Sequence, residues 1–471
     1  MRAHFLLAVV FVLVAFRASA GVQDSRSVNS SAWIIPSDED IRKLLSDRID
    51  VNHQGVGIVV GVIEPRGRRV IAYGKGATGS SRPLDGDSVF QIGSVTKVFT
   101  TLILADMVKR GELDLDDPVS RYLSGVRLPE LGRPITLRDL AMHTSGLPSM
   151  PTNFVLTSRP NPYETYSVDQ LYRFLTDYQL AREPGEKSEY SNLGVSLLGH
   201  LLARRAAVDY ETLVRTRVLK PLGMDSTSIT LTPDQSRRLA IGHDMYLRPV
   251  EQWNLPNLPG SGALRSTAND MLKFLAANLG YESGPIISAM VFQREVRKPV
   301  SGTVQQALGW QIGRVGNEEI VAHDGGKPGY RAYAAFNPRT RTGIVILANA
   351  RSDDRLSNLA LHLLTGRPLR PTPTAPEVRR VVSLSRKELD AFAGRYQLSP
   401  DVVLTLVRKE SHLLMDTTGD GISEFFPEKP TEFFSNTDNV QIRFEVAPSG
   451  SIEGLVLHQN GKDERATRIH R

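Results

Sequence analysis

The stretch VFQIGSVTKVFTTLILADMVKRGELDLDDPV, Val89 to Val119, combines an apolar helical pattern with two reactive side chains near its start. Ser94 and Lys97 follow Gly93 and lie one helical turn apart, so a helix places both on the same side. A serine at a helix start has a backbone N–H without a helical partner, and the helix dipole favours negative charge there. A desolvated lysine can lose its proton and act as a base towards the hydroxyl. The stretch therefore predicts a nucleophilic serine activated by a lysine.

The same stretch also fits a structural role. Ser94 would then cap its helix while Lys97 points into water, and an SxxK spacing is expected about once by chance in a chain of this length. The stripe of Val98, Leu102 and Met107 has helical spacing and predicts core packing. The chemical interpretation therefore depends on other motifs in the chain.

A second motif, GEKSEYSNLGVSLLGH, places Tyr190, Ser191 and Asn192 on a loop that enters a predicted helix. A tyrosine beside a lysine can relay the serine proton to a leaving group and later activate water. Asn192 could hydrogen-bond a substrate amide and hold Lys97 in place. A partly buried tyrosine and a turn asparagine are the alternative interpretation.

A third motif, VAHDGGKPGYRAY, carries His323, Asp324, Gly325 and Gly326 at the end of an apolar strand. Glycines there let a substrate approach the strand edge, and the N–H of Gly326 could form an oxyanion hole with that of Ser94. The alternative is a tight hairpin turn with a surface histidine.

The order of these motifs, SxxK, then YxN, then a (K/H)xG strand, resembles the penicillin-recognising serine hydrolases. The chain is similar to the branch that contains class C β-lactamases, D-alanyl-D-alanine carboxypeptidases and the related family VIII esterases, over residues 38–364. The resemblance implies Ser94 as nucleophile, Lys97 as its activating partner and Tyr190 as general base and acid. It also implies a substrate-binding set consisting of Asn192, His323, Asp324, Gly325 and Gly326.

Asp324 departs from the pattern of this family, in which lactamases and peptidases commonly have a threonine that contacts the substrate carboxylate. An ionised Asp324 pointing into the cleft would repel the carboxylate of a penicillin or of a terminal D-alanine by roughly 1 to 4 kcal/mol. Lys327 or Arg331 could offset this repulsion. A cleft-facing Asp324 therefore predicts inefficient β-lactam hydrolysis.

The surrounding segments predict an α/β (α+β) fold. GVGIVVGVIEPRGRRVIAYGKGA is typical of a β-hairpin, and four short strands follow much later, within residues 307–350. Strands at both ends of this region with helices between them indicate one sheet assembled from distant parts of the chain, with an inserted helical subdomain. The resemblance implies that this is the antiparallel, helix-flanked sheet of the β-lactamase/transpeptidase-like fold.

The composition divides the chain into four parts. We predict a signal peptide at residues 1–20 and a serine hydrolase domain at residues 21–366. A Pro/Arg-rich linker at residues 367–383 then leads to a small all-β domain at residues 384–471. Its predicted short strands lie within residues 391–398, 402–409, 412–417, 431–435, 440–448 and 450–461.

The first residues, MRAHFLLAVVFVLVAFRASAG, have a basic start, an apolar run and a small-x-small site ending at Ala20. This pattern predicts cleavage after Ala20 and a periplasmic or secreted protein of the bacterial cell envelope. The apolar run is shorter than the roughly 20 residues of a bilayer span, so we expect no stable membrane span after cleavage. A membrane anchor is the alternative.

The composition excludes several kinds of chemistry. The chain has no cysteine among its 471 residues, which removes thiol catalysis and thiolate metal sites. Its net charge of +6 comes from scattered basic residues, so nucleic-acid binding is not expected. Without HExxH or HxH motifs, neither a metal nor a cofactor is implied. We interpret His143 and His243 as structural residues and Trp310 as buried.

These observations predict an exported serine hydrolase that forms an acyl-enzyme on Ser94 with an amide or β-lactam, as a β-lactamase or D-alanyl-D-alanine carboxypeptidase does. A carboxylesterase of the same fold is the alternative within this class. A catalytically weak sensor that binds β-lactams or peptidoglycan is the alternative of another class. Expected partners are a β-lactam, a D-alanyl peptide or an ester, with peptidoglycan as a candidate. We assign substrate choice to the loops at residues 149–166 and around Trp253.

Overall fold

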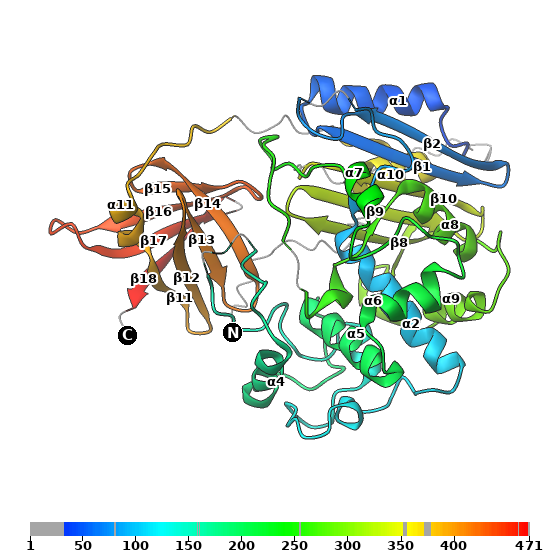
Figure 1. Ribbon diagram of the computed structural model, residues 1–471, viewed down its shortest axis with the longest axis horizontal. Coiled ribbons are helices and arrows are strands. Elements are labelled where there is room, and N and C mark those ends of the chain that lie inside the picture. Colours follow the sequence, from blue (N-terminus) through cyan, green and yellow to red (C-terminus); the bar gives the residue numbers. More distant parts are fainter. Residues whose placement is uncertain are drawn as a thin grey trace, which may run out of the picture.

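The computed structural model of the chain describes residues 33–79, 82–157, 159, 161–253, 256–351, 356–371, 378–459 and 461–469. The predicted signal peptide and residues 372–377 of the predicted linker lie outside these ranges. Figure 1 shows two parts side by side, a larger sheet lobe formed by residues 33–371 and a smaller barrel formed by residues 394–469.

The sheet lobe has strands near both ends of its sequence and most of its helices between them. The described helices are α1 Asp38–Ser46, α2 Thr96–Lys109, α3 Leu137–Ala141, α4 Val168–Asp177, α5 Asn192–Ala206, α6 Tyr210–Val214, α7 Pro233–Arg238, α8 Ala268–Asn278, α9 Ile286–Glu295 and α10 Leu356–Thr365. The strands of the main sheet are β1 Gly57–Glu64, β2 Gly67–Gly74, β5 Arg297–Ser301, β6 Val304–Ala307, β7 Gln311–Val315, β8 Glu318–Lys327, β9 Tyr330–Asn337 and β10 Thr342–Ala348. A separate pair consists of β3 Phe90–Gln91 and β4 Arg265–Ser266.

The main sheet joins segments that are far apart in sequence. Its eight strands have the order β2-β1-β10-β9-β8-β7-β6-β5, and all neighbours are antiparallel. The N-terminal hairpin pairs through β1 with β10, where Ile58 is opposite Ala348. The predicted antiparallel sheet with helices inserted between its halves is confirmed, and the hairpin β5–β6 extends it beyond the strands that the sequence indicates.

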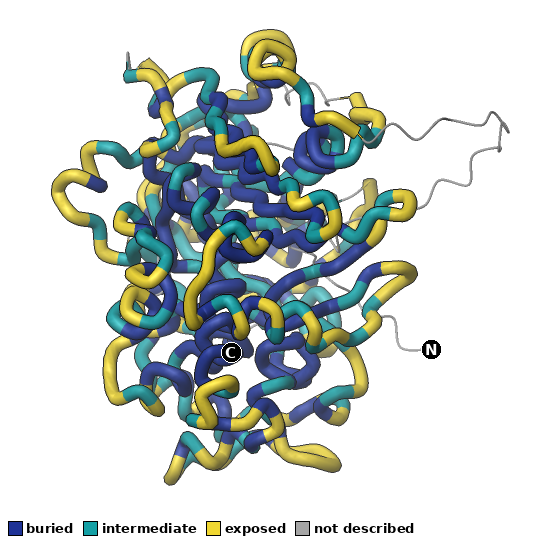
Figure 2. The backbone as a smooth tube through the Cα atoms, turned by 90° about the vertical axis from the view of Figure 1, so that its right-hand side faces the viewer, coloured by how far each residue is buried: buried dark blue, intermediate teal, exposed yellow. Residues whose placement is uncertain are grey.

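Both faces of this sheet are buried, because its strands alternate between two apolar clusters. In β1, Val59 and Ile63 belong to one cluster, with α2, α5 and α8, while Val60 belongs to the other, with α1 and α10. Side chains alternate between the faces of a strand, so each apolar run serves two helical layers. Figure 2 shows most of the buried segments in the interior and most of the exposed ones in loops at the periphery.

Helix α2 runs through the centre of the lobe, which explains why the sequence from Val89 onward is largely apolar. Val98, Leu102 and Met107 are fully buried, as predicted, and Trp310 is buried as well. Because neighbours surround α2, nearly all of its residues are inaccessible to water. The helix begins at Thr96, and Ser94 lies in the short 3-10 turn before it, Gly93–Val95.

The C-terminal region forms a closed eight-stranded antiparallel barrel, which confirms the prediction of an all-β module. Its strands are β11 Gly394–Ser399, β12 Val402–Lys409, β13 His412–Thr417, β14 Gly421–Lys429, β15 Glu432–Ser435, β16 Val440–Val446, β17 Ile452–Gln459 and β18 Lys462–Ile469. Pairing of β11 with β18 closes the barrel. Closure leaves no exposed edge strand.

One end of the barrel is closed by helix α11, Arg386–Phe392. Its Leu389 and Phe392 belong to the barrel core, and the Phe392 ring stacks on Phe444 at 4.3 Å between centroids. The hairpin turns β13–β14 and β15–β16 lie at the opposite end. The barrel therefore has one plugged end and one end formed by turns.

The barrel packs directly against the sheet lobe. Arg351 forms an ion pair with Asp438 at 2.6 Å, and Lys409 forms one with Glu251 at 2.8 Å. The amide of Ile422 donates to the Tyr163 hydroxyl at 3.0 Å, within an apolar cluster that both parts share. In the part of the chain that the structure describes, no helix has the length and hydropathy to cross a bilayer.

Candidate active site

Ser94 lies in a turn before helix α2 that packs against β8, an inner strand of the main sheet. The 3-10 turn that carries it follows β3, and Gly93 adopts a φ of 51°. A side chain on Gly93 would be strained at this φ and would meet the backbone of Gly326 at 2.7 to 2.8 Å. Glycine at position 93 therefore lets the serine turn pack directly against strand β8.

Lys97 is completely buried and bridges the first two motifs. Its Nζ lies 3.0 Å from Ser94 Oγ, 2.7 Å from Asn192 Oδ1 and 2.7 Å from the backbone oxygen of Ser261. A neutral amine in this position can donate to the two carbonyl oxygens and accept the proton of the serine hydroxyl. The structure thus brings Ser94, Lys97 and Asn192 into direct contact.

The environment of Lys97 favours its neutral form. Burial lowers the pKa of Lys97 well below its ordinary value, and the nearby charge of Lys327 lowers it further. The charge of Asp324 acts in the opposite direction on this pKa but is the smallest of the three effects. A lysine without its proton can serve as a base towards Ser94.

Tyr190 lies over Lys97 and beside Ser94. The Lys97 Nζ is 4.7 Å from the centroid of the Tyr190 ring. Burial raises the pKa of Tyr190 well above its ordinary value, while a hydrogen bond with the Ser94 side chain opposes that rise. The phenol therefore retains its proton near neutral pH, which suits it to donate to a leaving group more than to begin the reaction as a base.

His143 packs against the ring of Tyr190. Its ring stacks on that of Tyr190 at 4.5 Å between centroids, and its Nδ1 accepts a hydrogen bond from the Ser191 amide at 3.1 Å. Burial lowers the pKa of His143 to about 3, so the ring is neutral. The residue has a φ of 58°, as expected for the predicted turn. The HTSG sequence indicated that turn but not the contact with Tyr190.

Gly325 and Gly326 place the backbone of β8 against the serine turn. A Cβ on Gly325 would overlap the carbonyl oxygen of Ile92 and would lie 3.3 Å from the Ser94 nitrogen. A Cβ on Gly326 would meet only the flexible end of Arg331, at 3.0 Å, with Arg351 farther away. The backbone N–H groups of Ser94 and Gly326 are thereby held in one small region, as an oxyanion hole requires.

His323 and Asp324 lie on opposite faces of β8. His323 follows Val321 on the face towards Ser94 and is buried, and burial lowers its pKa to about 4. Asp324 is opposite Tyr333 in the β8–β9 pair, and Tyr333 belongs to the cluster on the far face. The pleat thus directs the carboxylate away from Ser94. The repulsion considered for a cleft-facing Asp324 is therefore not a direct contact.

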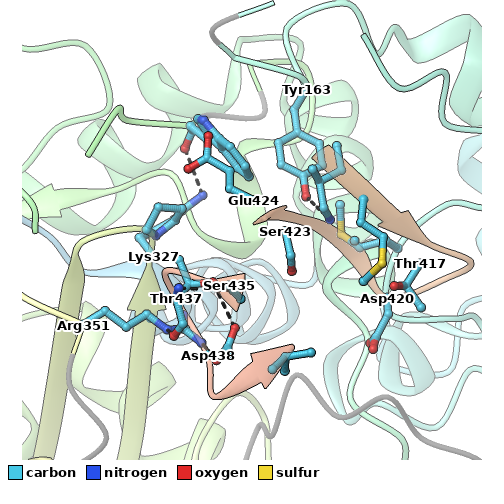
Figure 3. Close-up of a pocket in the computed structure, with 18 of the residues that line it drawn as sticks. Tyr163, Lys327, Arg351, Thr417, Asp420, Ser423, Glu424, Ser435, Thr437 and Asp438 are labelled. Carbon is cyan, nitrogen blue, oxygen red and sulfur yellow. Dashed lines mark hydrogen bonds and ion pairs between the residues drawn. The ribbon is translucent and has the colours of Figure 1, made fainter. Parts of the chain in front are cut away.

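A cavity of about 200 Å³ opens in front of Ser94. The sheet lobe contributes several residues to its lining, among them Asn192, Tyr163, Trp253 and Lys327. Both loops that the sequence indicated for substrate choice are therefore represented in the lining. Neither His323 nor Asp324 is among the described lining residues. Figure 3 shows Lys327 and Arg351 on one side of this cavity and barrel residues such as Ser423 and Thr417 across from them.

Lys327 is one of two cationic residues in the described lining of this cavity, with Arg351, and neither was predicted as a site residue. Its Nζ donates to the backbone oxygen of Trp253 at 3.4 Å. Burial and the charge of Arg265 lower the pKa of Lys327 to about 8. Across the described residues, no group of three or more His, Asp or Glu side chains is arranged to hold a metal ion.

Comparisons with known proteins identify the family and the fold of the chain. The model of the β-lactamase family matches residues 39–367, and that of a domain of unknown function, DUF3471, matches residues 378–468. Penicillin-binding protein 4* of Bacillus subtilis is 26% identical over 84% of this chain and 91% of its own length. The D-alanyl-D-alanine-carboxypeptidase/endopeptidase AmpH of Escherichia coli is 29% identical over 68% of this chain and 86% of its own. The solved structure of a class C β-lactamase superposes with a TM-score of 0.62 at 22% identity, covering 71% of this chain and 98% of that one.

Proposed function

Because the chain belongs to the β-lactamase family, we propose that it is a serine hydrolase that cleaves an amide or β-lactam bond through an acyl-enzyme on Ser94. The observation that carries this proposal is the contact between the Ser94 hydroxyl and the buried amine of Lys97, 3.0 Å apart. A buried lysine whose neutral form is favoured by a lowered pKa has a direct chemical use as the base that activates a serine.

In the proposed acylation step, Lys97 takes the proton of Ser94 as Oγ attacks the substrate carbonyl carbon. The carbonyl oxygen becomes an oxyanion, which the N–H groups of Ser94 and Gly326 stabilise. Tyr190 donates its proton to the leaving nitrogen as the C–N bond breaks, and the proton held by Lys97 restores the phenol. Asn192 orients Lys97 and is available to bind a substrate amide.

Deacylation reverses these roles. A water molecule attacks the ester carbonyl of the acyl-enzyme and gives up a proton to the Tyr190–Lys97 pair. Ser94 Oγ leaves and recovers a proton from the same pair, so the enzyme returns to its starting protonation state. The buried, neutral His143 keeps the Tyr190 ring in place by stacking, and it takes no proton in this scheme.

A substrate with a carboxylate fits the charges around the cavity. Asp324 faces the other side of the sheet, and Lys327 offers a cation a short distance along β8 from Gly326. This arrangement supports a β-lactam or a D-alanyl peptide over a neutral ester, because a half-buried ammonium gains most from a charged partner. The names of the two curated relatives point in the same direction, so we favour the amide-cleaving function over that of an esterase.

The test is incubation of the protein with a penicillin, followed by intact mass spectrometry of the protein and of the drug. We expect a penicilloyl adduct on the wild-type protein or hydrolysis of the drug, and neither in Ser94→Ala. Ser120→Ala, the same change at an exposed serine, is the matched control and should behave as wild type. Release of D-alanine from a pentapeptide in the same samples distinguishes a carboxypeptidase from a lactamase.

Two results would redirect the proposal. Ester cleavage by the wild type without any reaction towards amides or β-lactams indicates the carboxylesterase alternative. Binding of a penicillin that persists equally in Ser94→Ala, without turnover, indicates a binding protein. Export to the cell envelope stays a prediction, and the N-terminal sequence of protein isolated from envelope fractions tests it.

A further inference from the structure

The cavity in front of Ser94 is closed by the barrel as well as by the sheet lobe. Its described lining includes residues from strands β13, β14 and β15 and from the turns at the end opposite helix α11. Arg351 holds the β15–β16 turn through Asp438 and through the backbone oxygen of Thr437, at 2.6 and 2.8 Å. The Met150 amide holds the β13–β14 turn through the Gly419 oxygen at 2.9 Å. The open end of the barrel is thus fixed over the active site.

The side chains on the inner face of the barrel become smaller and more polar towards this open end. Deep positions carry packed apolar side chains such as Leu413 and Phe433, which belong to the barrel core. Alternation along the strands places the following lining residues on the same inner face, nearer the turns: Met415, Thr417, Gly421, Ser423, Phe425, Ser435, Val440 and Gln459. We call these eight residues the barrel mouth. The mouth combines small side chains, which leave space, with hydroxyl and amide groups over an apolar floor.

The barrel mouth carries no charged side chain among its eight residues, and two of the three carboxylates in the described lining around it are paired with basic side chains. Asp438 is paired with Arg351, and Glu424 is within 3.3 Å of both Lys409 and His412. Asp420 also lines the cavity, on the β13–β14 turn. The interior of the mouth therefore suits an uncharged group that can hydrogen-bond with hydroxyl and amide side chains.

We propose that the barrel mouth is a substrate subsite of the Ser94 site, which binds an uncharged, amide-bearing chain on the acyl side of the scissile bond. This inference rests on the proposed acyl-enzyme. Asn192, which is available for a substrate amide next to Ser94, lines the same cavity, so the acyl chain has a continuous path from the serine to the mouth. The hydroxyl and amide groups of the mouth would lose hydrogen bonds beneath an alkyl chain but keep them beneath a peptide chain.

The experiment compares the kcat/KM values of the full-length protein for three p-nitrophenyl esters. These are the acetate, the octanoate and the ester of N-acetylglycylglycine, whose acyl chain matches octanoate in length but contains two amides. Each value is divided by the spontaneous hydrolysis rate of the ester. We expect a preference of about tenfold or more for the N-acetylglycylglycyl ester over the octanoate.

Ser423→Leu and Gln459→Leu each replace a polar group of the mouth by an alkyl group, and both should reduce this preference at least several-fold. Thr467→Leu, at an exposed position of β18, is the matched control and should keep the wild-type preference. Thermal unfolding followed by circular dichroism confirms that each variant is folded. Because the two substitutions lie on different strands, a local folding defect at one of them would not explain the same result at both.

Equal normalised values for the two long esters in the wild type would overturn the proposal, as would a preference for octanoate. A wild-type preference that survives in both folded leucine variants would overturn it as well. If the wild type cleaves none of the esters, acetate included, and Ser94 forms no penicilloyl adduct, the proposed function itself has failed and this inference fails with it. Cleavage of the acetate with an unaltered preference in the variants refutes only the subsite.

Discussion

Replacement of Gly325 by alanine should inactivate the enzyme without unfolding it. The added Cβ would overlap the Ile92 carbonyl oxygen and would lie 3.0 Å from the Ile92 carbonyl carbon and 3.3 Å from the Ser94 nitrogen. All three contacts are with backbone, so neither side can relieve the clash by changing a rotamer. Strand β8 or the serine turn must move, and the two proposed oxyanion donors, the N–H groups of Ser94 and Gly326, separate. Loss of one such donor costs a factor of about 100 to 1,000 in kcat, or roughly 2.7 to 4 kcal/mol.

The assay is kcat for whichever p-nitrophenyl ester or β-lactam the wild type turns over, together with the melting temperature. Gly76→Ala is the matched control, because its Cβ would meet only a leucine methyl at 3.8 Å. Gly326→Ala adds a methyl that meets only the mobile end of Arg331, so its loss of activity should be at least about tenfold smaller than that of Gly325→Ala. A Gly325→Ala enzyme with the kcat of Gly76→Ala would refute the proposed packing of β8 on the serine turn.

Three further predictions concern ionisable groups. Since the neutral amine of Lys97 is the proposed base, kcat/KM should rise with pH through a pKa well below the ordinary lysine value of about 10.4, and a rise centred near that value would contradict the mechanism. Lys327→Met should raise KM for a penicillin by about tenfold to a hundredfold relative to a neutral ester, and the wild-type KM for the penicillin should increase above pH 8 as Lys327 loses its proton. Burial and the charge of Asp420 raise the pKa of Asp416 to about 7, above its unfolded value of about 3.9, so the folded state binds the extra proton and stability should fall as pH rises from about 4 to 7. Melting temperatures across this range should show a flatter profile in Asp416→Asn, and parallel profiles would contradict this assignment.

Some strands of the sheet and of the barrel could be predicted from the sequence and others could not, for identifiable reasons. Strands such as β10 and β13 carry continuous apolar residues and were predicted. Strand β18, Lys462–Ile469, was missed because Ala466 is its one fully buried residue and its other side chains are mostly polar. Strand β14 was missed because Gly421 and Pro427 interrupt its pattern, although the barrel accommodates both.

The sequence pointed to four candidate residues because their proposed chemistry depends on local spacing: Ser94, Lys97, Tyr190 and Asn192. A hydroxyl and an amine one turn apart, and a tyrosine two residues before an asparagine at a helix start, are patterns within short segments. Local spacing also indicated the glycines of the third motif. The family resemblance added their order along the chain and therefore the expectation that they meet.

The tertiary structure decided what these residues face. Asp324 is directed away from Ser94 by its register with Tyr333, and no local pattern specifies which face of a strand lies towards a distant serine. His143 contacts Tyr190 only because two loops converge. The barrel closes the cavity through contacts such as that between Ile422 and Tyr163, which are 259 residues apart in the chain. The sequence by itself determined the candidate reactive groups and the two modules. The shape of the site depended on packing between segments that are far apart in the chain, and the local pattern of one segment does not specify how it packs against another.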